Sequence, residues 1–206
     1  MAQQLRELGF QQFKSDASLF RSPERDIDVS VHVDDPIISG RDRQVVEKFL
    51  AELESRVLFK RAPILEPSGE PVVYRGRSYT RDFTSISVTP VPGYIAKTLQ
   101  ACGMANCNGV QTPGMSGSKP PLEEDPPLDP AEHKSFRSTL GRLMFLAGER
   151  GDIQFCLKEL ARSMSAPRAS DQLALKRLLR HLRATEGFGS KLSLPPRTAQ
   201  HLGSLR

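Results

Sequence analysis

The sequence predicts an α+β fold, in which a β-hairpin and short antiparallel strands with packed helices precede a helical region. Apolar residues occupy every odd position of 27–33, as in a half-buried strand. A proline-rich stretch at 112–130 is followed by apolar residues with the helical period of 3.6. We therefore expect a first domain at 1–111, a linker at 112–130, a helical region at 131–188 and a disordered tail at 189–206.

The composition is that of a folded domain without a membrane segment. The chain has 206 residues, of which 38% are hydrophobic, and this suffices for a core. No apolar run reaches the roughly 20 residues that cross a bilayer, and the N-terminal residues lack the apolar region of a secretory signal. We expect an intracellular protein, cytoplasmic or nuclear, that does not contact membranes. An odd number of cysteines, 3, argues against a disulfide framework.

Charge is divided unevenly along the chain. Residues 1–130 carry 15 Lys and Arg against 18 Asp and Glu, for a net charge of −3 (15 − 18). Residues 131–206 carry 14 against 6, for a net charge of +8 (14 − 6). A basic half is typical of proteins that bind a polyanion, although a solvated basic surface would have the same composition.

The elements expected in the first domain follow from local patterns. Gly9 ends a first helix, Asp42 caps the next, and Pro92 opens a third. The sequence Asp34-Asp35-Pro36 interrupts the alternating strand and predicts a hairpin tip. The expected order is helix 2–8, strands 18–20, 27–33 and 37–38, helix 43–56, strands 57–60, 72–79 and 86–88, and helix 92–99.

Three amphipathic helices are expected after the linker. Asp129, Pro130 and Glu132 form the pattern of a capping box with proline at the first helical position. Asp152 and Ser170 are the expected N-caps of the second and third helices. The leucine-rich stripes of all three helices are most simply core.

The adjacent carboxylates of Asp34 and Asp35 are the strongest chemical signal. Two carboxylates side by side repel one another unless a cation offsets their charge. Mg²⁺ binds such oxygens, and a pair of Mg²⁺ ions can activate a hydroxyl and stabilise a departing pyrophosphate. The alternative is a simple turn, because Asp and Pro are common turn residues.

The stretch from Val31 to Asp35 resembles the YXDD motif of reverse transcriptases, in the Tyr-Val-Asp-Asp form of copia-type retrotransposons. Other blocks resemble the copia-type Pol polyprotein in the same order. They lie at Leu8–Phe10, Ser15–Phe20, Gly93–Leu99, Cys102–Met104, Thr112–Pro113, Phe136–Arg137, Leu140–Leu143, Gly151–Phe155, Leu160–Arg162 and Lys176–Leu182.

The resemblance implies a C-terminal fragment of an RNA-directed DNA polymerase, with a partial palm followed by a thumb- or connection-like helical region. Asp34 and Asp35 would be the second and third catalytic aspartates and ligands of Mg²⁺ in two-metal nucleotidyl transfer. In the full-length family the partners are an RNA or DNA template-primer and dNTPs. The first aspartate lies in a strand with no counterpart here, so we expect the isolated chain to be inactive.

Several residues depart from the family pattern. Arg75 occupies the place of an apolar residue, and Arg150-Gly151 replaces Arg-Pro. His32 stands where the family has tyrosine, and Pro36 follows the aspartates directly. Because proline lacks an N–H, we expect the second hairpin strand to pair poorly. These departures keep open two alternatives, a nucleic-acid-binding remnant without catalysis and an inert transposon relic.

The third helix of the basic half has cations around its leucine stripe. We expect these residues to contact template-primer phosphates, or else to form the solvated side of an amphipathic helix. They are Lys176, Arg177, Arg180 and Arg183.

Overall fold

The computed structural model describes residues 1–33, 35–114, 117 and 119–194. It divides the chain into two compact units, Met1–Ala62 and Pro63–Arg206. The boundary therefore lies inside the expected first domain of 1–111 and not at the expected linker of 112–130. No helix of the described residues is both long and apolar enough to span a membrane.

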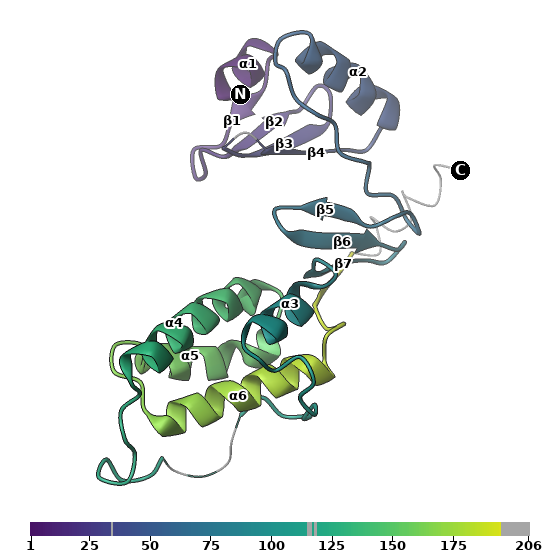
Figure 1. Ribbon diagram of the computed structural model, residues 1–206. Helices are drawn as coiled ribbons and strands as arrows, with labels where there is room; N and C mark the ends of the chain where they lie inside the picture. Colours follow the sequence, from purple (N-terminus) through teal and green to yellow (C-terminus); the bar gives the residue numbers. More distant parts are fainter. Residues whose placement is uncertain (34, 115–116, 118, 195–206) are drawn as a thin grey trace. The chain divides into compact units, whose positions relative to one another are not determined.

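The first unit is a four-stranded antiparallel sheet in the order β1-β2-β3-β4, with its two helices on one side (Figure 1). The expected elements of this unit are confirmed up to α2. The bounds are α1 Ala2–Glu7, β1 Gln11–Gln12, β2 Leu19–Ser22, β3 Ile27–His32, β4 Asp35–Gly40 and α2 Arg43–Glu54.

Alternation along the strands gives this sheet a buried face and an open face. Ile27 and Val29 of β3 are almost fully buried, together with Phe20 opposite Val29 on β2. They pack against Phe49 of α2, whose ring centroid lies 4.7 Å from that of Phe10. As expected, Asp42 caps α2, since its carboxylate accepts from two backbone N–H groups of the first turn.

The expected strand at 57–60 is wrong. The backbone N–H of Val57 donates to Leu53 and so ends α2, and the described residues 58–60 belong to no strand. Arg61 then holds the segment to α2 through ion pairs with Glu47 and Glu54. Val57 and Phe59 of this stretch pack against the core of the first unit, whereas Leu58 is fully exposed.

The second unit contains a second four-stranded antiparallel sheet, in the order β5-β6-β7-β8. The expected strand 72–79 is two strands, because Arg75 and Gly76 take positive φ angles of 49° and 74° and form a turn. The bounds are β5 Val72–Tyr74, β6 Arg77–Arg81, β7 Ser85–Pro90 and β8 Ser190–Ser193.

Strand β8 corrects the expectation that residues 189–206 are a disordered tail. Ser190 pairs with Val88, and Ser193 pairs with Ser85. The approach is close at Gly189, where a Cβ atom would lie 2.2 Å from the carbonyl oxygen of Val88. Residues 190–193 are ordered by a partner strand about a hundred residues earlier, a contact that their own sequence does not reveal. The expectation for 195–206 lies outside the described residues.

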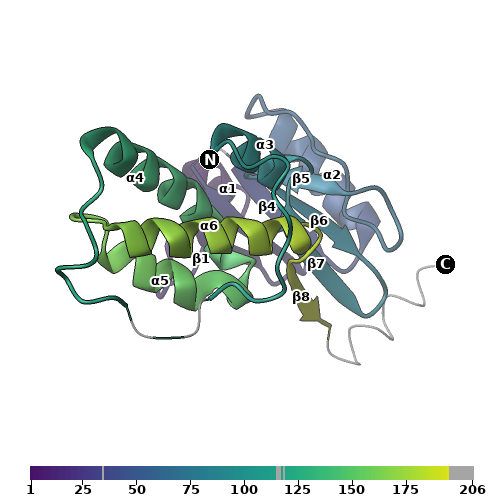
Figure 2. The same cartoon turned by 60° about the horizontal axis from the view of Figure 1, so that its bottom comes forward.

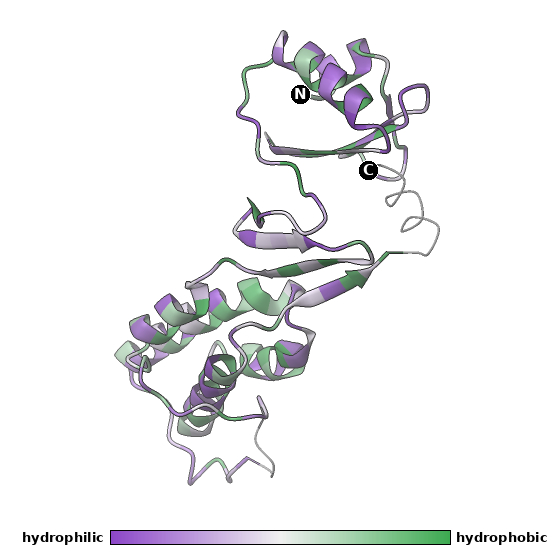
Figure 3. Ribbon diagram, turned by 90° about the vertical axis from the view of Figure 1, so that its right-hand side faces the viewer, coloured by the Kyte–Doolittle hydropathy of each residue, from purple (hydrophilic) through white to green (hydrophobic). Residues whose placement is uncertain are grey.

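The helices of the second unit form one apolar core, and α6 runs along α4 and α5 (Figure 2). Each long helix carries hydrophobic and hydrophilic residues, as amphipathic helices do (Figure 3). The capping box of Asp129 and Glu132 is confirmed. The bounds are α3 Tyr94–Ala101, α4 Pro130–Met144, η1 Phe145–Gly148, η2 Gly151–Ile153, α5 Gln154–Arg162 and α6 Ala169–Ala184.

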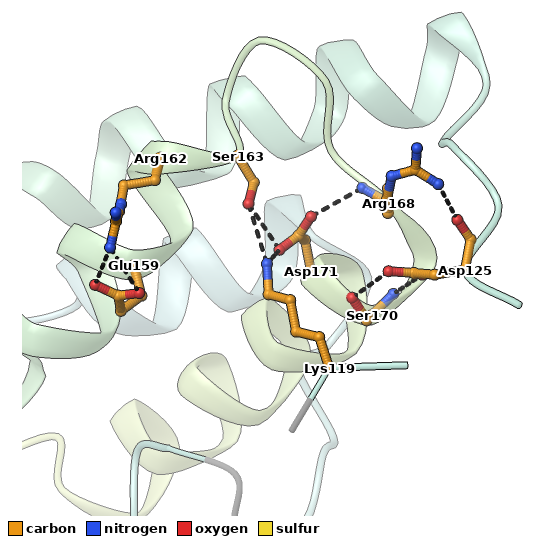
Figure 4. A network of polar contacts seen from close by, with 8 residues as sticks. All are labelled: Lys119, Asp125, Glu159, Arg162, Ser163, Arg168, Ser170 and Asp171. Atoms are coloured by element: carbon orange, nitrogen blue, oxygen red, sulfur yellow. Dashed lines mark hydrogen bonds and ion pairs between the residues drawn. The ribbon is translucent and has the colours of Figure 1, made fainter. Parts of the chain in front are cut away.

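Parts of the expected linker are fastened to α6 (Figure 4). The buried carboxylate of Asp125 accepts from the backbone N–H of Ser170 at 2.8 Å and from its hydroxyl at 2.6 Å. Lys119 forms an ion pair of 2.6 Å with the buried Asp171. The described residues of this segment before Pro130 belong to no helix or strand, yet they pack against α6 through polar contacts.

Two expected helix caps are wrong for the same reason. Ser170 lies inside α6, and its hydroxyl donates a hydrogen bond to Asp125. The N-cap position is Arg168, whose backbone N–H donates to Asp171. Asp152 lies in the 3₁₀ helix η2, and no side chain caps α5. The Ser170 side chain is held by the distant Asp125, and the Asp152 carboxylate is held by Arg150, two residues before it, and by His181.

Candidate functional site

The candidate site is the end of the β3–β4 hairpin. The register places His32 opposite Asp35, and this pair is the last one of the β3–β4 ladder. Asp34 itself lies outside the described residues. Val33 has a φ of 52° and is 76% exposed. This left-handed conformation costs a β-branched residue roughly 1–2 kcal/mol, and such strain is typical of tight turns at functional sites.

His32 and Asp35 lie on the open face of the sheet. Side chains alternate along β3, and Ile27 and Val29 face the helices. His32 therefore shares the opposite face with Asp28, whose carboxylate accepts two hydrogen bonds from Arg21 of β2. His32 and Asp35 are both exposed. Residues directly opposite in an antiparallel pair have Cβ atoms about 5 Å apart, so the two side chains start from neighbouring positions on this face.

The expectation that Pro36 weakens the second hairpin strand is wrong. Pro36 pairs with Val31, and the ladder continues from Asp35 to Gly40. In a two-residue hairpin the pair next to the loop exchanges hydrogen bonds, so the following pair does not. The ring nitrogen of Pro36 therefore points away from β3, and β4 is the outer strand of its sheet. Proline is tolerated where no ladder hydrogen bond needs its N–H.

The described residues alone do not supply a Mg²⁺ site. They contain no group of three or more His, Cys, Asp or Glu side chains placed to hold a metal ion. At the hairpin they offer one carboxylate, from Asp35, and one imidazole, from His32. Mg²⁺ requires near-octahedral oxygen ligands, often from carboxylates and substrate phosphates together. This donor set fits Mg²⁺ incompletely and needs oxygens from elsewhere.

Two of the four expected phosphate-binding residues on α6 bind the chain itself. The Nε of Arg177 donates to the carbonyl of Gly114 at 2.6 Å. The Nε of Arg180 donates to the carbonyl of Asn108 at 2.7 Å. Both arginines are half-buried and hold the loop before residue 115 against α6. Both guanidinium groups are partly exposed, but their hydrogen bonds to backbone carbonyls stabilise the fold of this chain.

The other two residues are more open. Lys176 is exposed, and Arg183 forms a long ion pair of 3.7 Å with Glu186 at i,i+3. An exposed pair of this kind contributes at most about 1 kcal/mol, so Arg183 can exchange its partner at little cost. Of the predicted phosphate-binding set, Lys176 and Arg183 are therefore the best placed for an external anion.

Sequence reasoning missed a buried polar cluster between η2 and α6. Arg150 is 1% exposed and donates to both carboxylate oxygens of Asp152 and to the carbonyl and hydroxyl of Thr185. The Nε2 of the buried His181 lies 2.9 Å from the same carboxylate. Hydrogen bonds from Arg150 and then from His181 oppose desolvation and lower the pKa of Asp152 from 3.8 to about 2. The signal available in the sequence was Arg150, two residues before Asp152 and next to the apolar stripe of the second helix, which is compatible with a buried ion pair.

The chain is similar in sequence to retrotransposon Pol polyproteins. No protein-family model and no solved structure matches it significantly. It is 30% identical to the retrovirus-related Pol polyprotein from transposon RE1 of Arabidopsis thaliana. The aligned region is 185 residues long and covers 88% of this chain. It is 29% identical over 193 residues to the corresponding polyprotein from transposon RE2 of the same plant, again over 88% of this chain.

The chain spans 12% of the length of each of these relatives. A match over 88% of the chain is too long to fit inside either compact unit, so it includes parts of both. The similarity supports a fragment of a retrotransposon Pol polyprotein.

Proposed function

We propose that the chain is the C-terminal part of the reverse transcriptase domain of a copia-type Pol polyprotein, in which Asp34 and Asp35 are metal-binding carboxylates. The observation that carries the proposal is the β3–β4 hairpin. Asp35 is the first residue of β4, and it pairs with His32 of β3 at the end of the stretch that resembles the YXDD motif. The similarity to two retrotransposon Pol polyproteins supports the same conclusion.

In this proposal divalent cations supply activation of the primer 3′-hydroxyl and stabilisation of the departing pyrophosphate. The chain itself contributes negative charge at the hairpin and a rigid support for it. The support is the packing of β3 on α2 through Val29 and Phe49. A further carboxylate and the nucleotide-binding surface must come from another segment of the polyprotein, so we expect no polymerase activity from the isolated chain.

The test uses a full-length Pol polyprotein of the matched kind in which this chain replaces the matching segment. We expect RNA-templated primer extension, and Asp34→Asn or Asp35→Asn should lower its rate about a hundredfold or more, because each removes a carboxylate that would hold a divalent cation, whose charge stabilisation is worth several kcal/mol. Asp28→Asn is the matched control, since Asp28 lies on the same strand but is held by Arg21. Equal extension by the Asp35→Asn and Asp28→Asn proteins would falsify the proposal.

A second candidate function is nucleic-acid binding without catalysis. It is favoured by the net charge of +8 in residues 131–206, with 14 basic against 6 acidic residues. Lys176 and Arg183 are the exposed cations expected to contact phosphates. An inert relic is the remaining alternative, and cooperative thermal unfolding of the purified chain would count against it, because drifted sequences seldom retain a packed core.

A further inference from the structure

We infer that the groove between α4 and α5 is a docking site for an amphipathic, acidic helix from another segment of the Pol polyprotein. The inference goes beyond the proposed function, because neither Asp34 nor Asp35 takes part in it. It rests on the proposal that the chain is one part of a longer polyprotein. The matched region is 12% of each relative, so most of each relative lies outside it.

The floor of the groove is apolar and partly open to solvent. Met144 of α4, Ala147 of η1, and Leu157 and Ala161 of α5 line a hollow of about 520 Å³. This volume lies in the range of roughly 300–1,000 Å³ that is typical of binding pockets. Met144 is 49% exposed. Because the flexible methionine side chain adapts to different partners, this floor fits the aliphatic side chains of a second helix.

A glycine inside α4 extends the open surface beside Met144. Gly141 precedes Met144 by three residues, so the two lie on the same side of the helix. A Cβ atom at Gly141 would meet no described atom within 4 Å outside the backbone of its own helix. Glycine weakens a helix relative to alanine, and no contact of the described residues requires it here. The bare backbone allows a partner helix to approach closely.

The rim of the groove is basic. Lys158 and Arg162 line it on α5, and Arg137 is exposed on α4 two helical turns before Met144. Glu159 forms an ion pair of 3.3 Å with Arg162, but both side chains are exposed. Such a pair contributes little, so Arg162 can exchange its partner. Cations on both sides of an apolar floor are complementary to an apolar stripe bordered by Asp and Glu.

The lining favours a polypeptide over a single-stranded nucleic acid. Surfaces that bind single strands combine cations with aromatic rings on which the bases stack. The residues that line this groove include no aromatic ring, and the exposed Phe155 of α5 is not among them. An amphipathic helix instead inserts aliphatic side chains at positions i, i+3, i+4 and i+7 into a groove of this kind.

The experiment measures binding of the whole chain to overlapping peptides by fluorescence anisotropy. The peptides, each of about 20 residues or five to six helical turns, cover the Pol polyprotein from transposon RE1 outside the matched region. We expect binding by peptides whose apolar residues have helical spacing and are bordered by Asp or Glu. Binding should weaken as salt is added, because the rim charges are exposed.

Met144→Glu combined with Lys158→Glu should lower the affinity about tenfold or more, as changes at the centre of an interface commonly do. The matched control is Leu173→Glu combined with Lys97→Glu. It makes the same charge change at an exposed leucine and an exposed lysine that do not line the groove. The control should bind the peptides as the unchanged chain does.

Gly141→Glu separates loss of binding from loss of folding. Glutamate favours a helix more than glycine does, so thermal unfolding should occur at the same temperature or higher. Peptide affinity should nevertheless fall about tenfold, because the new carboxylate occupies the open surface and repels an acidic partner. In a further test, a bound peptide whose acidic residues are changed to lysine should bind Lys158→Glu better than it binds the unchanged chain.

Each outcome decides the inference. Peptide binding that is lost in the double variant and in Gly141→Glu, but is kept in the control, supports it. The inference is overturned if no peptide binds, if the control loses as much affinity, or if Gly141→Glu binds as the unchanged chain does. Displacement of the peptides by single-stranded RNA, with RNA binding lowered by the same variants, also overturns it, because the groove would then be a nucleic-acid surface. None of these variants changes the hairpin, so the primer-extension test decides the proposed function independently.

Discussion

The guanidinium of Arg150 forms two hydrogen bonds of 2.8 and 2.7 Å with the carboxylate of Asp152, two residues later in the chain. Arg150 is 1% exposed, and its five guanidinium N–H groups are offered to this carboxylate and to the carbonyl and hydroxyl oxygens of Thr185. The contact joins the 3₁₀ helix η2 to the end of α6.

Asp152→Asn is expected to destabilise the second unit. It removes the counter-charge of a buried arginine, which costs about 3–5 kcal/mol when both partners are buried. The Asp152 side chain is 33% exposed, so we expect about 2–3 kcal/mol, measured by urea unfolding. The matched control is Glu159→Gln, which breaks an exposed i,i+3 pair with Arg162 and should cost less than about 1 kcal/mol. Equal losses in both variants would contradict the role of the cluster.

The same carboxylate should make stability depend on acid pH. The pKa of Asp152 is lowered from 3.8 to about 2, first by the hydrogen bond from Arg150. Its contribution is complete above the unfolded pKa near 3.8 and is lost as the pH falls through 2. Between pH 4 and 2 the unfolding free energy of the unchanged chain should therefore fall more steeply than that of Asp152→Asn. Parallel curves would show that Asp152 does not contribute to this dependence.

Asp125→Ala should loosen the segment before α4. The mutation leaves the N–H and hydroxyl of Ser170 without their acceptor in the first turn of α6. Loss of such an acceptor typically costs about 1–2 kcal/mol, and limited proteolysis within residues 119–128 should be faster. Glu123→Ala, at an exposed position two residues away, is the control. If both variants are cleaved at the rate of the unchanged chain, the contact does not restrain the segment.

Phe49→Ala tests the core of the first unit. Its ring is fully buried between the sheet and Phe10, and removing such a ring typically costs about 3–5 kcal/mol. Phe13→Ala, at a phenylalanine that is 43% exposed, should cost much less. Thermal unfolding is the measurement.

Lys176→Gln with Arg183→Gln tests nucleic-acid binding by the second unit. Each phosphate contact that is lost on a single strand should reduce the slope of log affinity against log salt by about 0.7. We therefore expect a slope about 1.4 smaller for the double variant on single-stranded RNA. The control is Arg25→Gln, which removes an arginine paired with Glu52 in the first unit. An unchanged slope in the double variant would show that α6 does not contact phosphates.

The sequence by itself determined the elements whose causes lie within a few residues. Alternation in residues 27–33 predicted β3, and the spacing of Asp129 and Glu132 predicted the capping box that opens α4. The cap of α2 by Asp42 is equally local. These features follow from side-chain periodicity and from hydrogen bonds between near neighbours, so they can be read without knowing the tertiary structure.

Only the tertiary structure decided which distant groups meet. Ser190 joins a sheet through Val88, Ser170 binds Asp125 from 45 residues away, and Asp152 lies against His181 from 29 residues away. In each case the local pattern indicated a tail, a cap or a linker. Each of these contacts supplies a distant partner that the local sequence does not reveal, and burial favours such contacts because an unpaired buried polar group is costly. The same reasoning holds at the hairpin, where the sequence supplies His32 and Asp35 and the strand register makes them neighbours.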